Sequence, residues 1–394
     1  MKILWVYGDF LHPTTRGGQI RTLETLKRLH ARHDVHYAGL LHPTNSEGAA
    51  RAHEYASHVY PVPHSLLSKT SPAFVLQLAK GLVDPLPVAI FRHRSDEMRA
   101  TVDRLRRDIA FDHIVCDFLS SAPHFSDLCD VTLFQHNVEV VIWRRHVENA
   151  ATPLHSAYFN LQARRMIAYE RKVCQAVKNV IAVSESDAQK MRDMYGVTRV
   201  SAVPTGVDVS FYAPPSQTET TADLVFVGSM DWMPNVDGIL WFATEVLPLI
   251  KKKLPGCSLA VVGRTPAREV ADLAQRDAGI RITGTVEDVR PYLWGAKVAI
   301  VPLRIGGGTR LKIYEAMAAR TAVVSTTIGA EGLDVTSGEN IFIANTAEAF
   351  ADACVRLVTD SNERSRLSDA AWENVSSRHS WDAAASAFER SLNL

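Results

Sequence analysis

The segment from Val301 to Leu333 constrains the fold more than any other part of the chain. It begins as the end of an apolar strand, passes through Gly306, Gly307 and Gly308, and enters a short helix before a second apolar strand. Glycines let backbone N–H groups come close to a ligand, because no Cβ stands in the way. A strand, a glycine-rich turn and a helix in this order predict one unit of an open α/β sheet.

The start of that helix carries the residue types of an anion site. Thr309 is a suitable N-cap, and Arg310 and Lys312 add positive charge to the first turn. We therefore predict that this turn holds a diphosphate. Glu315 lies one to two turns further along and could accept hydrogen bonds from ribose hydroxyls. The alternative interpretation is an ordinary glycine-rich turn with solvated cations, but the combination of charged residues favours the anion site.

Length and composition predict a globular protein of two domains. The chain has 394 residues, of which 46% are hydrophobic and 22% charged. Basic and acidic residues both number 43, so the net charge indicates no nucleic-acid partner. Residues 1–205 hold 25 basic and 20 acidic residues, which leaves 18 and 23 for the rest. The basic half could lie against anionic lipid headgroups, although such an imbalance is more often a solvated surface.

The five cysteines are widely spaced and form no C-x-x-C pair. This pattern predicts reduced thiols in the cytosol and no zinc site. The first residues, MKILWVYGDF, predict a strand rather than a signal peptide, and no apolar run is long enough to span a bilayer. We therefore expect a cytoplasmic protein whose membrane contact, if it has any, is peripheral.

The N-terminal half opens with a strand, a glycine-bearing loop and a helix. The strand covers residues 2–7, and Gly17 and Gly18 precede a helix over residues 19–32. These two glycines could approach a phosphate at the carboxyl end of the strand. The fingerprint G-x-G-x-x-G is absent, which argues against a nicotinamide cofactor.

His136 is the histidine that we single out. It follows a predicted strand over residues 131–134, at the carboxyl end where open α/β sheets build their sites. Fourteen of the 15 histidines precede residue 205, so most of them must be structural or exposed. His136 is therefore chosen for its position and not for its type.

The strand–helix pattern restarts after residues 206–222, a proline- and polar-rich segment that we interpret as a domain linker. Three strands of the second half are predicted to end just before the residues Gly228 and Ser229, Gly263 and Arg264, and Gly284 to Val286. The chain is thus expected to form two α/β domains, with room between two sheets for a two-part substrate.

Short motifs recur along the chain in a fixed order: AVSESD from Ala182, PTGVD from Pro204, FVGSMDWMPNVDG from Phe226, VVGR from Val261, GTVEDVRPYL from Gly284, then KIYEAMA and AVVSTTIGAEGL. Together with the glycine pair of the first loop, they resemble the retaining family 4 glycosyltransferases of the GT-B fold. The resemblance covers essentially the whole chain and is most specific in the second half.

The resemblance implies two Rossmann-like α/β/α domains that face each other across a cleft. Residues 1–205 would bind the acceptor, 223–375 would bind the nucleotide sugar, and the helix 376–394 would return to the first domain. The implied activity is metal-independent, retaining transfer by a hexosyltransferase without a cofactor. The donor would be a UDP-sugar or, next, a GDP-sugar. The acceptor would be a glycan, a lipid-linked sugar or a small molecule in polysaccharide or glycoconjugate biosynthesis.

The resemblance also implies roles for single residues. His136 would contact the donor sugar, and Arg310 and Lys312 would stabilise the diphosphate, so these three are the expected catalytic residues. Glu315 would bind the ribose. The remaining expected donor-binding positions are Gly17, Gly18, Gly228, Ser229, Arg264, Thr285, Val286, Gly306, Gly307, Gly308 and Thr309.

Two departures from the family pattern stand out. Gly307 occupies the position of the first of two glutamates that the family often has. Ser229, with the pair Pro234 and Asn235, stands where an arginine and a lysine commonly hold the pyrophosphate. A nucleotide-sugar 2-epimerase of the same fold, or a non-catalytic nucleotide-sugar-binding subunit, are the alternative interpretations. The PTGVD and KIYEAMA patterns favour transfer over epimerisation.

Overall fold

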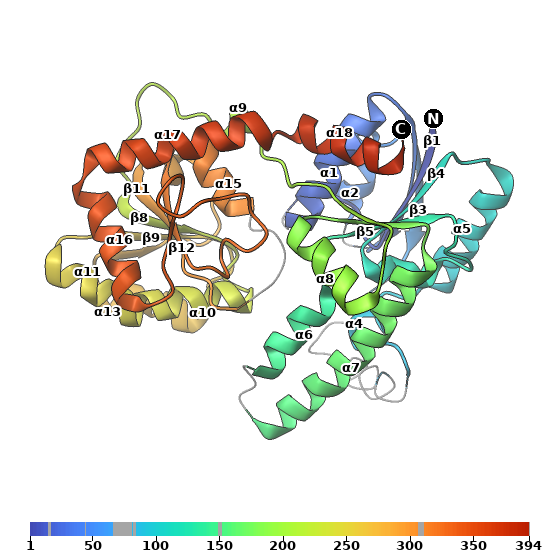
Figure 1. The fold of residues 1–394 in the computed structure, drawn as a ribbon, viewed down its shortest axis with the longest axis horizontal. Helices are drawn as coiled ribbons and strands as arrows, with labels where there is room; N and C mark the ends of the chain where they lie inside the picture. The colour runs from blue at the N-terminus through green and yellow to red at the C-terminus, as the bar shows by residue number, and fades with distance from the viewer. Residues whose placement is uncertain are drawn as a thin grey trace. The chain divides into compact units, whose positions relative to one another are not determined.

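The computed structural model describes residues 1–14, 17–43, 45–65, 81, 84–148, 152–305 and 311–393 (Figure 1). They form two compact units, Met1–Thr205 with Ala384–Leu394, and Gly206–Ala383. Each unit is a parallel sheet covered by helices, so the predicted α/β class is confirmed. No helix of these ranges is long and apolar enough to cross a membrane.

The N-terminal unit contains a seven-stranded parallel sheet in the order β3-β2-β1-β4-β5-β6-β7. Its strands are β1 Lys2–Tyr7, β2 Asp34–Leu41, β3 His58–Pro63, β4 His113–Asp117, β5 Val131–Gln135, β6 Asn179–Ala182 and β7 Val200–Ala202. The strand order reverses between β1 and β4. The carboxyl ends of these two strands therefore form the switch point at which open α/β sheets bind ligands.

Helices cover both faces of this sheet, because alternate residues of each strand face opposite sides. They are α1 Gly17–His30, α2 Ser46–Ala50, η1 Ala52–Glu54, α4 Val88–Phe91, α5 Asp96–Asp108, η2 Leu119–His124, α6 Glu139–Glu148, α7 Pro153–Ala176 and α8 Glu185–Tyr195. Trp5 packs with Leu26 of α1 on one face, and Leu4 shares a core with Val102 of α5 on the other. Ser184 caps α8, because its Oγ accepts from the N–H of Asp187 at 3.1 Å.

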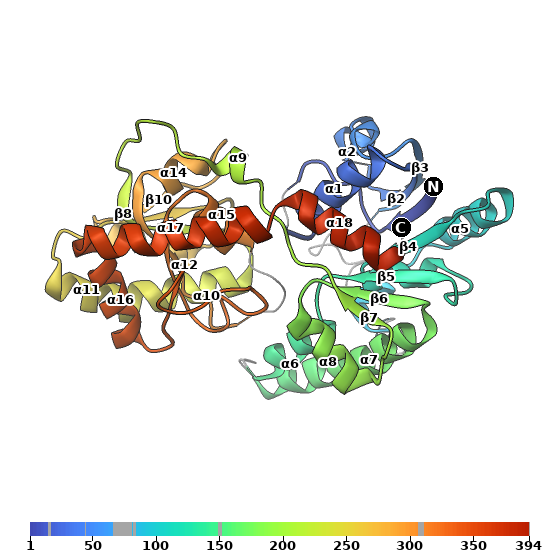
Figure 2. The same cartoon turned by 45° about the horizontal axis from the view of Figure 1, so that its top comes forward.

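The C-terminal helix α18, Trp381–Leu392, packs into the N-terminal unit (Figure 2). The ring of Phe388 lies 5.4 Å from that of Trp5 and 4.9 Å from that of Phe134. The predicted return of the last helix to the first domain is thus confirmed. The two units divide at Ala384 and not at residue 376, because α17, Ser361–Arg378, buries Val375 in the core of the second unit.

The C-terminal unit contains a six-stranded parallel sheet in the order β10-β9-β8-β11-β12-β13. Its strands are β8 Ala222–Val227, β9 Leu259–Val262, β10 Ile280–Ile282, β11 Ala296–Val301, β12 Ala322–Ser325 and β13 Phe342–Ile343. Here the order reverses between β8 and β11, which places a second switch point at the carboxyl ends of these strands.

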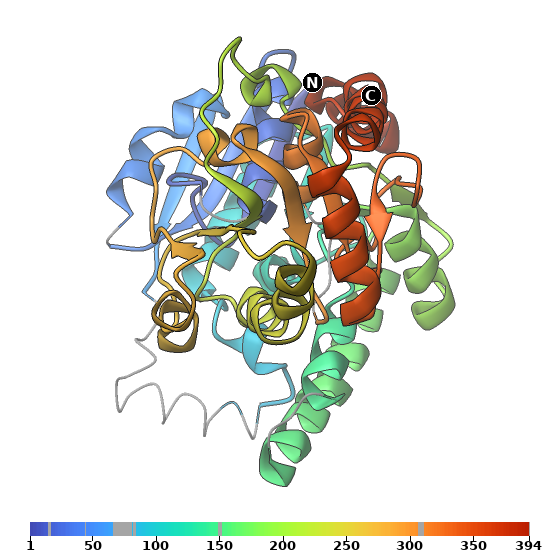
Figure 3. The ribbon, with the colours of Figure 1, turned by 90° about the vertical axis from the view of Figure 1, so that its left-hand side faces the viewer.

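The helices of this unit also pack on both faces of its sheet. They are α9 Val209–Tyr212, α10 Met233–Trp241, the π-helical η3 Phe242–Val246, α11 Leu247–Lys253, α12 Arg268–Ala271, α13 Leu273–Arg276, α14 Arg290–Trp294, α15 Leu311–Ala318, α16 Ala347–Thr359 and α17. The helices α11 and α16 lie side by side (Figure 3). Ile250 of α11 and Phe350 of α16 share a core with Phe226. Tyr314 of α15 packs on the opposite face.

The first residues of the segment 206–222, which we interpreted as a domain linker, pack against the C-terminal unit. Asp208 caps the short helix α9, because its Oδ1 accepts from the N–H of Phe211 at 2.9 Å. Val207 is buried and forms a bridge with Ser380. Apolar residues before the proline-rich stretch therefore anchor the segment in the C-terminal unit, and the division falls between Thr205 and Gly206.

Because His124, at the end of η2, is buried, we expect the protein to lose stability in mild acid. Its side chain is fully buried, Nε2 donates to the carbonyl oxygen of His93 at 2.9 Å, and burial lowers its pKa from 6.5 to about 4. The unfolded chain therefore binds the proton first as the pH falls. With respect to this group, the free energy of unfolding is therefore highest above pH 6.5. It falls as the pH drops to about 4, by a total of roughly 3 kcal/mol. Urea unfolding across this range measures the loss.

His124→Gln provides the comparison, because its amide can still donate to His93 but does not titrate in this range. We expect the variant to show a flatter dependence of unfolding free energy on pH than the wild type. His53→Gln is the control, since His53 is exposed. Equal slopes for wild type and His124→Gln would contradict the prediction.

Candidate active site

Three buried polar side chains meet at the switch point of the N-terminal sheet. Asp117 ends β4, His136 follows β5, and Arg21 comes from α1; each is at most 4% exposed. The Nε2 atom of His136 lies 2.7 Å from Oδ1 of Asp117, and its Nδ1 lies 3.0 Å from Nη1 of Arg21. The structure thus brings the predicted His136 together with two residues that lie far from it in the chain.

These contacts define the protonation of His136. A guanidinium can only donate, so Nδ1 accepts from Arg21, and Nε2 carries the proton that it donates to Asp117. Burial lowers the pKa of His136 although Asp117 opposes the shift, and the ring is therefore neutral at pH 7. Both ring nitrogens are engaged within the protein. The predicted contact of His136 with a donor sugar stays a prediction. Such a contact would use atoms of His136 other than these two ring nitrogens.

Phe118 packs against this cluster in an unusual backbone conformation. Its φ is 65°, which is rare for a bulky residue, and its ring stacks on that of His136 with 3.9 Å between centroids. A Cβ at Gly18 would lie 2.5 Å from Cζ of Phe118. Gly18 is thus required here for packing, whereas Gly17 is exposed at the start of α1. Their predicted approach to a phosphate stays a prediction.

Asp117 accepts hydrogen bonds from two further side chains besides His136. Its Oδ2 accepts from Nε1 of Trp5 at 2.9 Å and from Oγ1 of Thr22 at 2.7 Å. Arg21 also donates from Nε to Oγ1 of Thr205 at 3.0 Å. Neither Arg21 nor Asp117 was among the residues predicted for the site. Asp117 carried the same positional signal as His136, a polar residue at a strand end.

A pair of carboxyl groups, Glu139 and Glu170, lies beyond β5. Glu170 of α7 accepts from the N–H groups of Glu139 and Val140 at 2.9 and 3.1 Å, and so holds the first turn of α6. Burial and the charge of Glu170 raise the pKa of Glu139 to about 7. A carboxyl group with this pKa is suited to proton transfer near neutral pH. Glu139 was not predicted as a site residue, because in the sequence it looks like an ordinary glutamate at the start of a helix, and only the fold brings it next to Glu170.

In the C-terminal unit, Lys312 lies against the switch point of the sheet. Its Nζ donates to Oδ1 of Asn235 at 2.9 Å and lies 4.6 Å from the centroid of the Phe226 ring. A Cβ at Gly228 would come within 2.6 Å of the same Nζ. The predicted donor residue Gly228 therefore makes room for the ammonium group at the end of β8.

Arg264 extends this cluster from the end of β9. Its Nε donates to Oγ of Ser229 at 2.7 Å, and its Nη2 lies 3.8 Å from Oδ2 of Asp231. The backbone oxygen of Ser229 accepts from Nδ2 of Asn235 at 2.8 Å. Lys312, Asn235, Ser229 and Arg264 thus form one connected chain. A guanidinium from the neighbouring strand reaches Ser229, where the family pattern would place a cation.

Glu315 lies one turn after Lys312 and is partly buried. Burial raises the pKa of its carboxyl group, while a hydrogen bond from Tyr212 and the charge of Lys312 oppose the shift. Tyr212 belongs to α9, in the segment that was expected to be a linker. Since Tyr212 contacts Glu315, this segment contributes to the candidate site.

The ends of β9 and β10 meet through the N–H of Gly263, which donates to the carbonyl oxygen of Gly284 at 3.3 Å. Thr285 and Val286 follow directly, so they lie at the same sheet edge as Arg264. The remaining predicted residues, Gly306, Gly307, Gly308, Thr309 and Arg310, lie outside the described residues. Their predicted roles stay predictions.

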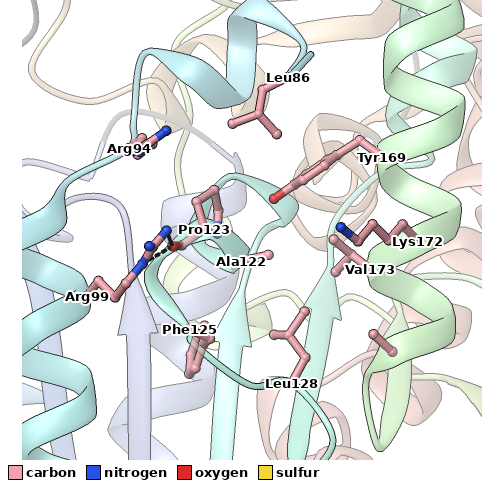
Figure 4. Close-up of a pocket in the computed structure, with 11 residues that line it drawn as sticks. Leu86, Arg94, Arg99, Ala122, Pro123, Phe125, Leu128, Tyr169, Lys172 and Val173 are labelled. Carbon is pink, nitrogen blue, oxygen red and sulfur yellow. Dashed lines mark hydrogen bonds between the residues drawn. The ribbon is translucent and has the colours of Figure 1, made fainter. Parts of the chain in front are cut away.

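A separate cavity of about 220 Å³ lies between α5, η2 and α7 of the N-terminal unit (Figure 4). It is lined by Leu86, Arg94, Arg99, Ala122, Pro123, Phe125, Leu128, Tyr169, Lys172, Val173 and Ala176. The Tyr169 hydroxyl and the Lys172 ammonium point toward it, while Arg99 donates to the carbonyl oxygen of Pro123. None of the residues of the two polar clusters lines this cavity.

Comparisons with known proteins agree with this architecture. A curated relative, the "Uncharacterized 44.6 kDa protein in cps region" of Klebsiella pneumoniae, is 22% identical over 362 residues, which are 89% of each chain. Sucrose-phosphate synthase of Thermosynechococcus elongatus superimposes with a TM-score of 0.72 at 17% identity, over 99% of this chain and 98% of that one. The Anabaena protein HepE, solved with UDP and glucose, gives a TM-score of 0.67 at 13% identity, over 100% and 99%.

Two family descriptions match the sequence in succession. Residues 15–211 match Glycosyltransferase Family 4, and residues 221–360 match Glycosyl transferases group 1. The first match alone spans half of the chain, and the two together follow the two structural units. The predicted resemblance is confirmed: this chain belongs to the group 1, family 4 glycosyltransferases of the GT-B fold.

Proposed function

We propose that this glycosyltransferase moves a hexose from a nucleoside-diphosphate sugar to an acceptor with retention at the anomeric carbon and without a metal. The connected chain of Lys312, Asn235, Ser229 and Arg264 carries the proposal. It brings an ammonium and a guanidinium to the carboxyl edge of one sheet, where a diphosphate can be bound. Fixed cations at this place can stabilise the charge that develops on the leaving group.

The nucleoside half of the donor would lie on the same edge. The Glu315 carboxylate is suited to accept hydrogen bonds from the ribose hydroxyls, and the backbone after Gly284 lies beside Arg264 for contacts with the base. UDP is the proposed nucleotide and GDP the next choice, in line with the UDP and glucose bound to HepE. We further propose that the chain acts in the synthesis of a polysaccharide or glycoconjugate.

The N-terminal unit is the proposed acceptor side. Burial and the charge of Arg21 favour the neutral ring of His136, and its hydrogen bonds with Arg21 and Asp117 fix its orientation, so we assign it to the reacting edge as a positioning residue. The donor phosphate would take the proton of the acceptor hydroxyl.

The cavity between α5 and α7 offers apolar walls and the Lys172 ammonium, which suits a lipid-linked acceptor at the cytoplasmic face of a membrane. The family matches favour transfer over a 2-epimerase or a non-catalytic subunit.

Thermal unfolding with a panel of nucleotide sugars tests the donor assignment. Because a ligand that binds only the folded state raises stability with its occupancy, we expect the largest rise in Tm with a UDP-sugar. The rise should persist in EDTA. It should shrink in Arg264→Ala, which loses one proposed diphosphate contact, and remain in Arg281→Ala, whose exposed side chain lies on β10 away from Ser229.

Two outcomes would contradict this assignment. One is a chain that no nucleotide sugar stabilises. The other is an equal rise in Tm for wild type and Arg264→Ala, which would show that the guanidinium does not contact the donor. Incubation of the donor alone, followed by analysis of its sugar, separates transfer from epimerisation, because an epimerase needs no acceptor.

A further inference from the structure

Two histidines and an aspartate gather at the amino ends of β2 and β3, away from both polar clusters. In the parallel pairing of these strands, His36 lies opposite His58. Asp34 precedes His36 by two residues, so both side chains project from the same face of β2. The carboxyl ends, which carry the candidate active site, form the opposite edge of the sheet.

The ligand atoms of the three side chains have the spacing of a metal site. Oδ2 of Asp34 lies 3.4 Å from Nε2 of His36, and Oδ1 lies 3.5 Å from Nε2 of His58. One ligand atom from each residue falls within 4.8 Å of the others. Tetrahedral zinc, with bonds of about 2.0–2.1 Å, separates its ligand atoms by about 3.4 Å.

His36 is already oriented for this role. Its side chain is 5% exposed, its Nδ1 lies 2.9 Å from the hydroxyl of Tyr60, and its ring packs edge-on against Phe111. Without an ion, Nε2 carries the proton that it donates to Oδ2 of Asp34, and Nδ1 accepts from the Tyr60 hydroxyl. A metal at Nε2 would displace that proton, and Nδ1 would then donate to the Tyr60 oxygen. Metal-binding histidines usually donate their other ring nitrogen to such a partner, which fixes the tautomer and the ring.

His58 is the proposed ligand whose side chain can change its orientation. Its ring stacks on that of His36 with 4.3 Å between centroids, and 54% of its side chain is exposed. It can therefore turn its Nε2 toward an ion without disturbing the core. The positive charge of Lys2, whose position in β1 pairs with that of Asp34 in β2, also acts on His36.

We propose that Asp34, His36 and His58 bind one zinc ion, with water as the fourth ligand. The ion would join the edge strand β3 to β2 and stabilise the N-terminal unit, with no part in sugar transfer. The widely spaced cysteines predicted no zinc site, and this site uses no cysteine. Sequence inspection did not find it, because His58 lies 22 residues after His36 and only the strand pairing brings them together.

Calorimetric titration of the full chain, without a histidine tag and after treatment with EDTA, tests the site with zinc chloride. We expect one saturable site per chain in the wild type. His58→Ala should weaken binding roughly tenfold or more, and Tyr60→Phe should weaken it about tenfold through the orientation of His36. His53→Ala, which removes another exposed histidine of the same unit, should bind as the wild type does.

Thermal unfolding provides the second measurement. Zinc should raise the Tm of the wild type and of His53→Ala but not that of His58→Ala, whose exposed side chain can be removed without a cavity. Cobalt bound in place of zinc should give the visible absorption of a tetrahedral site. The proposal is overturned if the wild type shows no saturable site, or if His58→Ala binds zinc as tightly as the wild type.

Discussion

Lys312→Ala is expected to lower the turnover number by a factor on the order of a hundred or more. In the proposed site the Lys312 ammonium faces the diphosphate that leaves with a developing negative charge. Its stabilising effect is therefore greatest in the transition state, and its loss should lower kcat more than it raises KM. Initial rates over a range of donor concentrations, with a fixed acceptor, measure both constants.

Lys312→Arg should not restore the rate. The space around Nζ is small, since a Cβ at Gly228 would lie 2.6 Å away and Asn235 holds the ammonium at 2.9 Å. A planar guanidinium is larger and would displace one of these neighbours. Full activity in Lys312→Arg would show that only the charge matters.

Lys297→Ala is the matched control for Lys312. It removes a lysine of the same unit, whose Nζ lies 2.8 Å from Oδ1 of Asp223 at the amino ends of β11 and β8. Exposed ion pairs of this kind contribute little to stability. We expect a normal rate in Lys297→Ala, and a normal rate in Lys312→Ala would remove the lysine from the proposed diphosphate site.

The sequence was sufficient to predict the class of each sheet. Runs such as residues 298–301 are apolar throughout, as buried parallel strands are, and both sheets are parallel. The packing of the segment that follows residue 205 was harder to predict. The proline-rich composition of residues 213–222 concealed the packing of Val207 and Tyr212 just before it, because packing depends on partners such as Ser380 and Glu315 that are distant in sequence.

The candidate site was predictable where one short segment supplies it. Lys312 and Glu315 lie one helical turn apart, and they occupy one side of α15. The link between Arg264 and Ser229 could not be predicted, because it depends on the adjacent pairing of β8 and β9. Arg21 and His136 are separated by 115 residues, and only the meeting of α1 with the end of β5 joins them.

The second large effect is expected at Asp117. Asp117→Ala removes the acceptor of three buried donors, on Trp5, Thr22 and His136. It also removes a negative charge near the buried Arg21, whose pKa is lowered to about 10 by burial, with Asp117 opposing the shift. A buried cation without its compensating charge typically costs about 3–5 kcal/mol. Urea unfolding should show a loss of this size.

Asp112→Ala provides the control at the amino end of the same strand region, where Asp112 accepts from the exposed N–H of Lys2 at 2.7 Å. We expect it to change stability by less than about 1 kcal/mol. Equal losses in the two alanine variants would contradict the network as described.

Asp117→Asn separates charge from shape at the same position. The amide keeps one oxygen acceptor and nearly the same volume, but its NH₂ group would face a donor of Trp5, Thr22 or His136. If it turns its oxygen toward Trp5 and Thr22, His136 must change tautomer to accept from the amide, and its Nδ1–H would then face the guanidinium of Arg21. Transfer should therefore fall in Asp117→Asn even where the unit stays folded, while most of the rise in Tm with a UDP-sugar should persist, because the proposed contacts of Lys312, Arg264 and Glu315 with the diphosphate and the ribose lie in the other unit. A normal transfer rate in folded Asp117→Asn would show that the tautomer of His136 does not matter for the reaction.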